Sequence, residues 1–447
     1  MTVSLGTLRR CFEGAVPSAI ATCAPDGTPN VTKLSQVHYI DDSHVALTYQ
    51  FFSKTRENVL SNARATVEVV DPVTAAPYHL HVEYLRTETA GPLFENMKAR
   101  LAAIASHSGM SKVFRLLGSD IYRVKGVEPV PGGEPVEVAP RPALLSGLRA
   151  CLAGFAPAPD LAHLLDAALE GLEHNWDINH SMLLLLDPNR NCLYTVASRG
   201  YAESGVGSEI RMGEGIIGVA ARERTPIRIG YAVQEYRYVH AARKSFQQSD
   251  NVAVEMEIPL PGLPNSGSQL AVPLTLGRRL LGVLYVESPN EQRFGYEDED
   301  ALVVLAGQLA ASIELLSQSA EQPGDAAASA TPLPAASGAP AAIRHFAADH
   351  SVFVDNDYLI KGVAGAIAWK LLREYREEGR AEFTNRELRL DPALKLPDIA
   401  DNLEARLILL QRRLTERCPF IAIEKTGRGR FRLNVARPLQ LTDMPAR

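Results

Sequence analysis

The stretch QFFSKTRENVLSNARATV, residues 50–67, joins the end of an apparent strand to a helical pattern through a polar cluster. The cluster consists of Ser53, Lys54, Thr55 and Arg56. The free N–H groups at a helix N-terminus attract anions, and hydroxyl and cationic side chains beside them add further donors. The stretch therefore favours a phosphate site, and a solvated turn with an N-cap is the alternative that these residues leave open.

Strand patterns flank this junction on both sides. Residues 19–52 contain three β-rich runs separated by the turns PDGTP and IDDSH, which predicts a meander of antiparallel strands. After the short helix, ATVEVVDP and YHLHVEYLRTE predict two more strands, and DIYRVKGVEPV predicts the last strand. Between YHLHVEYLRTE and DIYRVKGVEPV lies a helical pattern with Met97, Leu101 and Ile104 on one face.

Residues 14–131 resemble the flavin-binding split barrels related to pyridoxamine 5′-phosphate oxidase. The resemblance depends on the order of strands, on the Ser/Lys/Thr cluster and on the pattern N-x-x-x-N-A-R-A-T-V. It implies bound flavin mononucleotide (FMN) and a homodimer that completes the flavin site. The implied phosphate ligands are Ser53, Lys54 and Thr55 with Arg56 close by, and the implied strand beside the isoalloxazine ring carries Lys33, Leu34, Ser35 and Gln36.

Three departures from this family limit what the resemblance implies. Asn62-Ala63 replaces the usual Asn-Pro, and Lys54-Thr55 replaces the usual Arg-then-Lys order. No residues match those that grip a pyridoxamine phosphate substrate. Flavin binding is therefore favoured over the family's oxidase reaction, and no catalytic residue is assigned.

Histidines and cysteines offer two further candidate sites. His79 and His81 share one face of a predicted strand, a spacing compatible with a metal or haem contact but more typical of a half-solvated strand face. The five cysteines are scattered and show no zinc spacing, which indicates free thiols and leaves a redox role for Cys23 open. We expect no metal site.

Length and composition predict a globular protein of about three domains. The chain has 447 residues, of which 46% are hydrophobic and 22% charged. No apolar run approaches the ~20 residues of a membrane span, and the first residues lack the pattern of a signal peptide, so we expect a cytoplasmic protein without membrane contact. Residues 402–437 carry nine basic and three acidic side chains, or +6, whereas the whole chain carries −6, which leaves −12 elsewhere. This asymmetry favours a polyanion-binding end on an acidic body.

Changes in composition divide the chain into several domains, and their predicted strands and helices indicate a multidomain α+β protein. We expect a split barrel over 1–132, a second domain over 141–317, a flexible linker over 318–343 and a third domain over 344–438. The linker is rich in Ala, Pro, Ser and Gly and has no apolar periodicity.

Residues 144–316 resemble a GAF domain, an α/β sensor fold. The resemblance depends on G-E-G-I-I-G together with A-V-P-L-x-x-G-R-R-L-L-G-V-L. GAF domains bind cyclic nucleotides, tetrapyrroles, small aromatics or only their own copy, and the cyclic-nucleotide signature is not found here. The segment around residues 231–250 suggests a small-molecule pocket or a surface helix and loop, with Tyr236, Tyr238, His240 and Arg243 as the candidate ligand residues. A stripe of Leu302, Leu305, Leu309, Ile313 and Leu316 predicts a core helix, with a dimer seam as the alternative.

Residues 358–438 resemble the winged-helix effector domains of response regulators. The pattern predicts a long helix, a second helix capped by Thr384 with Glu387 three residues on, a third helix and a hairpin around KTGRGR. In the third helix Leu403, Leu407, Leu410 and Leu414 are expected inside, and Arg406, Arg413 and Arg417 largely outside. The resemblance implies contacts with duplex DNA from Arg406, Gln411, Arg412, Arg413 and Arg417 on the helix and from Lys425, Thr426, Arg428 and Arg430 on the wing; a protein-docking winged helix is the alternative.

Together these patterns favour a flavin-linked, ligand- or redox-responsive regulator with a DNA-binding output. The rival from another class is an FMN-dependent oxidoreductase related to pyridoxamine phosphate oxidase, with regulatory GAF and partner-docking domains. A further rival is a scaffold whose first two domains only dimerise.

Overall fold

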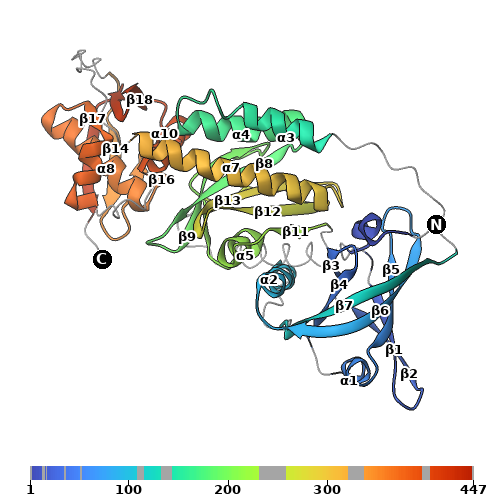
Figure 1. Cartoon of the computed structure of the whole chain (residues 1–447). Helices are drawn as coiled ribbons and strands as arrows, with labels where there is room; N and C mark the ends of the chain where they lie inside the picture. The colour runs from blue at the N-terminus through green and yellow to red at the C-terminus, as the bar shows by residue number, and fades with distance from the viewer. Residues whose placement is uncertain are drawn as a thin grey trace.

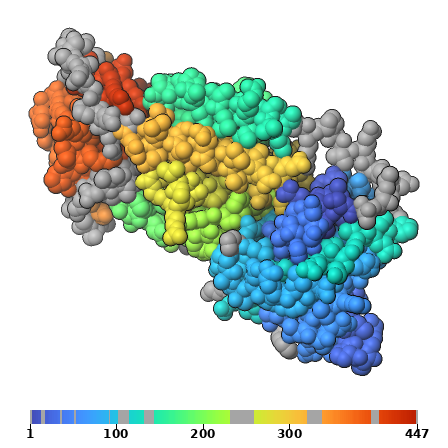
Figure 2. All heavy atoms as spheres, in the orientation of Figure 1, coloured from blue at the N-terminus to red at the C-terminus, as the bar shows by residue number. Residues whose placement is uncertain are grey.

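The computed structural model describes residues 3–12, 16, 18–34, 37–50, 53–107, 115–131, 143–230, 258–320, 337–394 and 403–444. Figure 1 shows three units in a row, with a middle unit between the N-terminal and C-terminal units. Each unit contains both helices and β-sheet, which agrees with the expected multidomain α+β protein at the level of mixed helix and sheet. The units touch one another, as the space-filling view in Figure 2 also shows.

The N-terminal unit is a seven-stranded antiparallel sheet with two α-helices and a short 3₁₀ helix. Its strands lie in the order β2-β1-β5-β6-β7-β4-β3. The elements are η1 (Leu5–Phe12), β1 (Ser18–Cys23), β2 (Pro29–Leu34), β3 (Val37–Asp41), β4 (His44–Tyr49), α1 (Lys54–Ser61), β5 (Arg64–Val70), β6 (Pro77–Glu88), α2 (Pro92–His107) and β7 (Gly118–Pro129).

The expected meander of the first strands is wrong. The β-rich run over residues 29–41 divides into β2 and β3, which lie at opposite edges of the sheet. Each edge strand pairs only with its hairpin partner, β2 with β1 and β3 with β4. The long strands β5, β6 and β7 fill the space between the hairpins, and this insertion comes from residues far along the chain.

The middle unit is a six-stranded sheet covered by helices on both faces. Its strands lie in the order β10-β9-β8-β13-β12-β11. One face packs against α3, α4 and α7, and the other packs against α5. The elements are α3 (Leu144–Ala153), α4 (Leu161–Trp176), β8 (His180–Asp187), β9 (Cys192–Arg199), β10 (Glu209–Arg211), α5 (Gly215–Glu223), β11 (Ile227–Ile229), β12 (Ser268–Leu276), β13 (Arg279–Ser288) and α7 (Tyr296–Ala320).

Helix α7 is the core helix that its leucine stripe predicts. Leu302, Leu305, Leu309 and Ile313 are all buried in the core of the middle unit, and Leu316 packs at its edge. By length and composition alone, α7 is the one helix within the described ranges that could span a bilayer. Its position against the sheet accounts for its apolar character.

The C-terminal unit contains more β-structure than the sequence suggests. Its helices and hairpin follow the expected order, but β14, β15, β16 and β20 add a four-stranded sheet, and β17 joins the hairpin. The elements are β14 (Ala341–Phe346), β15 (Ser351–Val354), β16 (Asp357–Ile360), α8 (Gly362–Glu378), β17 (Glu382–Thr384), α9 (Asn385–Leu390), η2 (Pro392–Leu394), α10 (Leu403–Arg417), β18 (Ile421–Gly427), β19 (Arg430–Val435) and β20 (Leu439–Met444).

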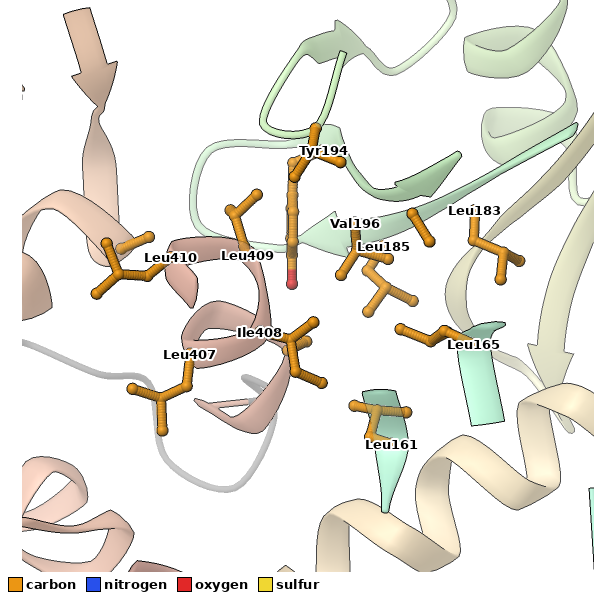
Figure 3. Close-up of a cluster of buried hydrophobic side chains, with 14 of the residues drawn as sticks. Leu161, Leu165, Leu183, Leu185, Tyr194, Val196, Leu407, Ile408, Leu409 and Leu410 are labelled. Carbon is orange, nitrogen blue, oxygen red and sulfur yellow. The ribbon is translucent and has the colours of Figure 1, made fainter. Parts of the chain in front are cut away.

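The expected linker over 318–343 is shorter at both ends where the structure describes it. Helix α7 continues to Ala320, and strand β14 begins at Ala341. The C-terminal unit is also not a separate body on a tether, because α10 contributes to the same apolar core as α4, β8 and β9. Figure 3 shows Ile408 of α10 pointing toward Leu161 and Leu165, and Leu409 lying beside Tyr194.

Candidate functional sites

The junction of β4 and α1 forms a small cavity in the N-terminal unit. Ser53 caps α1 and accepts a hydrogen bond from the Arg56 backbone N–H at 3.5 Å. The cavity measures about 210 Å³. Its lining includes five of the predicted flavin residues, Lys33, Leu34, Ser53, Thr55 and Arg56, together with Thr48, Tyr49, Gln50, Asp120 and Tyr122.

Two of the predicted flavin-binding residues, Lys54 and Arg56, form contacts with other side chains of the protein. The Lys54 ammonium lies outside the cavity lining and pairs with Glu57 at 3.3 Å. The Arg56 guanidinium donates to the Asp120 carboxylate at 2.6 Å and to the Thr87 hydroxyl at 2.8 Å. Burial raises the pKa of Asp120, and its bonds to Thr87 and Arg56 offset only part of this effect. Arg56 is therefore held in the lining of the cavity by Asp120 and Thr87. The other two predicted residues, Ser35 and Gln36, lie outside the described residues.

The hydroxyls of Ser53, Thr55 and Thr48 in this cavity can donate to a phosphate oxygen, whereas the side-chain oxygen of Gln50 only accepts and needs a donor. The Thr48 hydroxyl and the Gln50 side-chain oxygen are buried without hydrogen-bond partners among the described residues, and both residues line the cavity. Buried polar atoms of this kind mark a site where a partner is missing. At about 210 Å³ the cavity is smaller than the roughly 300–1,000 Å³ typical of ligand pockets, so it would hold only part of a flavin.

His79 and His81 lie on a partly solvated strand face. His79 contacts Glu68 at 3.3 Å, and His81 contacts Glu128 at 3.2 Å. Within the described ranges, no group of three or more His, Cys, Asp or Glu side chains is arranged to hold a metal ion. These contacts favour the solvated-face interpretation of the two histidines. All five cysteines are free thiols, and Cys23 is partly exposed.

Helix α10 forms a polar as well as an apolar interface with the middle unit. The Arg406 guanidinium lies 2.9 Å from the Asp187 carboxylate, and its charged group lies 4.1 Å from the centre of the Tyr194 ring. Arg412 donates to the Val196 carbonyl at 3.1 Å and to the Asp166 carboxylate at 2.6 Å.

Arg406 and Arg413 were expected largely outside the buried face of α10, and this expectation is wrong. Their exposed fractions are only 4% and 3%. Arg413 donates to the Leu359 carbonyl at 3.0 Å and pairs with Glu416 at 3.1 Å. The reason is that α10 is enclosed on two sides, by its own unit and by the middle unit, so that every residue from Leu403 to Leu410 is buried.

The hairpin β18–β19 adds a second polar contact with the middle unit. Lys425 pairs with Asp160, the N-cap of α4, at 3.0 Å and with Glu404 at 2.7 Å. Burial would raise the pKa of Asp160, but hydrogen bonds from His163 and Lys425 outweigh it and hold the pKa at about 2. Asp160 is therefore ionised at neutral pH, and its pair with Lys425 is maintained there.

The remaining predicted DNA residues line a groove or the surface beside it. A groove of about 730 Å³ lies between α10, the hairpin and the residues just before α4, and its lining includes Gln411, Lys425, Thr426, Arg428 and Arg430. Arg417 is half exposed and approaches Glu203 at 3.9 Å. The structure thus brings the predicted basic residues together, but turns most of the helix set toward the middle unit. The candidate GAF residues Tyr236, Tyr238, His240 and Arg243 lie outside the described residues.

The acidic partners of α10 could not be selected from the sequence. Asp160 is the N-cap of α4, Asp166 lies within α4 and Asp187 ends β8, and no motif marks them in the sequence. Each becomes significant only because a basic residue 219 to 265 positions later in the chain packs beside it.

Comparison with known proteins identifies the middle unit. Residues 158–314 match the GAF domain family, and this part of the chain is a GAF domain, a fold of sensory and regulatory proteins. The comparison with curated proteins finds no match.

Several solved structures resemble single units of the chain. The GAF domain of a phosphoenolpyruvate-protein phosphotransferase from Acinetobacter is 23% identical, covering 38% of this chain and 90% of that chain with a TM-score of 0.30. Free methionine-R-sulfoxide reductase from Neisseria meningitidis, solved with its substrate, is 19% identical, covering 39% of this chain and 90% of that chain with a TM-score of 0.30. An FMN-binding protein from Syntrophomonas wolfei is 17% identical, covering 29% of this chain and 87% of that chain with a TM-score of 0.24.

Proposed function

We propose that the chain is a cytoplasmic, ligand-responsive regulator in which the GAF domain holds a DNA-binding winged helix in a docked state. The C-terminal unit supplies the winged helix, with α10 as the DNA-reading helix and the β18–β19 hairpin as the wing. The N-terminal unit is an FMN-binding split barrel, and the protein acts as a homodimer. The observation that carries the proposal is the set of basic residues on α10 and the hairpin that bind acidic residues of the GAF domain.

The docked state makes DNA binding and GAF binding compete. Arg406, Arg412 and Lys425 are engaged with GAF carboxylates, and a phosphate backbone would need the same cations. A ligand that changes the GAF surface would alter this competition, because it shifts the equilibrium by its difference in affinity for the two states. The regulated step is therefore the release of α10 from the GAF domain.

The competition is tested by changing the GAF side of the interface and leaving every basic residue intact. Asp160→Asn together with Asp166→Asn removes two carboxylates that contact Lys425 and Arg412, and Asn preserves the N-cap at position 160. We expect tighter binding to a fluorescent 30-base-pair duplex at low salt, by about fivefold to tenfold, since exposed or half-exposed ion pairs contribute up to ~1 kcal/mol each. Fluorescence anisotropy gives the affinity.

A matched control removes the same charge from another part of the GAF domain. Glu170 and Glu173 pair with Arg199, within the GAF domain, so their replacement by Gln should leave DNA affinity almost unchanged. Equal affinity gains in both double variants would mean that net charge alone explains the result. Absence of duplex binding in every variant at low salt would remove the DNA-binding proposal.

The flavin part of the proposal is tested separately by calorimetric titration with FMN. Ser53→Ala and Thr55→Val each remove a hydroxyl that lines the cavity, and we expect each to weaken FMN binding by ~1.5–3 kcal/mol, the range for a hydrogen bond to a charged group. Lys54→Gln is the control with little expected effect, because Lys54 pairs with Glu57 outside the cavity lining. No uptake of FMN by the unmodified protein would contradict this part.

A further inference from the structure

Three side chains form a polar row across the GAF sheet. Glu287 of β13 pairs in register with Gln269 of β12 on one side and with His180 of β8 on the other. Directly paired residues of antiparallel strands point to the same face of a sheet. Tyr285, two residues before Glu287, lies on this face and packs with the residues of α5. The row therefore lies on the α5 face, beside an apolar layer.

Glu287 is a buried carboxylate that has no cationic partner within the described part of the chain. Its exposed fraction is 2%. The Leu263 backbone N–H donates to Oε1 at 3.0 Å, and the Tyr285 hydroxyl donates weakly to Oε2 at 3.4 Å. Among the residues that the structure describes, no lysine or arginine forms an ion pair with it. Burying a carboxylate in this way is costly unless a cation or further donors compensate for it.

Two polar atoms near Glu287, from Gln269 and Tyr201, have no hydrogen-bond partner of ordinary geometry within the described residues. Gln269 is 6% exposed, and its side-chain oxygen accepts no hydrogen bond within the described part of the chain. The Tyr201 hydroxyl likewise makes no hydrogen bond of ordinary geometry there, and its ring lies 5.6 Å from that of His180. Burial, and after it the Glu287 carboxylate, raises the pKa of Tyr201 far above its usual value, so this hydroxyl stays neutral. The row thus offers unused acceptors side by side.

We propose that Glu287 and Gln269 recognise the cationic nitrogen of a small organic amine, which is the ligand class of this GAF domain. An ammonium group supplies the charge that Glu287 lacks and the N–H donors that the Gln269 oxygen lacks. The face of an aromatic ring such as Tyr201 attracts cations and provides an apolar surface for the rest of the molecule. This inference rests on the GAF domain acting as the sensor of the proposed function.

Benzylammonium is a suitable first probe because its neutral analogue, benzyl alcohol, has nearly the same size and shape. We expect benzylammonium to raise the melting temperature of the full chain in a concentration-dependent manner and benzyl alcohol to have little effect. Glu287→Gln should weaken the response to benzylammonium at least tenfold. Since Gln removes an uncompensated charge at the same volume, this variant should also melt at a higher temperature than the wild type when no amine is present.

Three results would overturn the amine site. They are an equal response to the amine in wild type and Glu287→Gln, an equal response to the alcohol, and a lower melting temperature of Glu287→Gln without ligand. Gln269→Leu provides a second variant that keeps the carboxylate, and it should weaken the amine response without abolishing it. The DNA experiment with Asp160→Asn and Asp166→Asn uses no ligand, so failure of the amine site and failure of docking control give different results.

Discussion

Arg406 illustrates how much the environment of one residue depends on distant parts of the chain. Its guanidinium lies between the Asp187 carboxylate and the Tyr194 ring, both from the GAF domain. The spacing of leucines in α10 locates the inward face of this helix correctly, since Leu403, Leu407, Leu410 and Leu414 are buried. The same spacing cannot predict that the GAF domain packs on the opposite side of α10. For this reason the sequence wrongly predicts that Arg406 is exposed to solvent.

A double-mutant cycle measures the Arg406–Asp187 interaction. Arg406→Met alone should lower the free energy of unfolding by about 3–5 kcal/mol, because Asp187 is left buried and unpaired. In the background of Asp187→Asn, which can still accept hydrogen bonds from the Asn189 and Arg190 backbone N–H groups, the same change should cost far less. Urea denaturation gives the four energies. Equal costs in both backgrounds would mean that the pair contributes no coupling energy.

At the scale of single elements, local signals in the sequence were reliable where the cause of the structure is local. The pattern T-x-x-E predicts the start of α9, and the Thr384 hydroxyl indeed accepts from the Glu387 backbone N–H at 3.2 Å. In contrast, the continuous β pattern over residues 29–41 gives no sign that β2 and β3 belong to opposite edges of a sheet. Strand order depends on β5, β6 and β7, which lie far away in sequence.

The cap of α9 gives a prediction at this scale. Thr384→Ala should lower the free energy of unfolding by about 1 kcal/mol, because one N–H group at the helix start loses its acceptor. Thr384→Ser keeps the hydroxyl and should be close to neutral. Chemical denaturation of the full chain measures both variants, and an equal loss for Ser and Ala would assign the effect to the methyl group of threonine.

At the scale of the whole molecule, the three units form a continuous body. Helix α2 of the N-terminal unit packs on α5 of the GAF domain, with the Asn96 side chain donating to the Thr225 hydroxyl at 2.8 Å. At the other end, α10 completes the apolar core around α4, β8 and β9 (Figure 3). Sequence patterns suggest where one unit ends and the next begins, but they do not indicate which units dock, because docking residues look like the ordinary surface of each unit.

This arrangement predicts the behaviour of a shortened chain. A protein ending at residue 320 lacks Leu407, Ile408 and Leu409 and would expose part of the apolar cluster on the GAF domain. We expect a lower melting temperature and association detectable by light scattering, because exposed apolar patches promote aggregation. The full-length Asp160→Asn and Asp166→Asn variant keeps its apolar cover and should remain monodisperse. A shortened chain as stable and as monodisperse as the full one would contradict the shared core.

The parallel pairing of β14 with β20 places the first and last strands of the C-terminal unit side by side and running in the same direction. Ala341 lies opposite Leu439, and Phe346 lies opposite Met444. Because the two strands run the same way, the chain enters the unit at one end of the pair and leaves it at the other, roughly 17 Å away at about 3.3 Å per residue. A fluorescent tag attached after Met444 would therefore emerge at the opposite end of this strand pair from a tag inserted before Ala341.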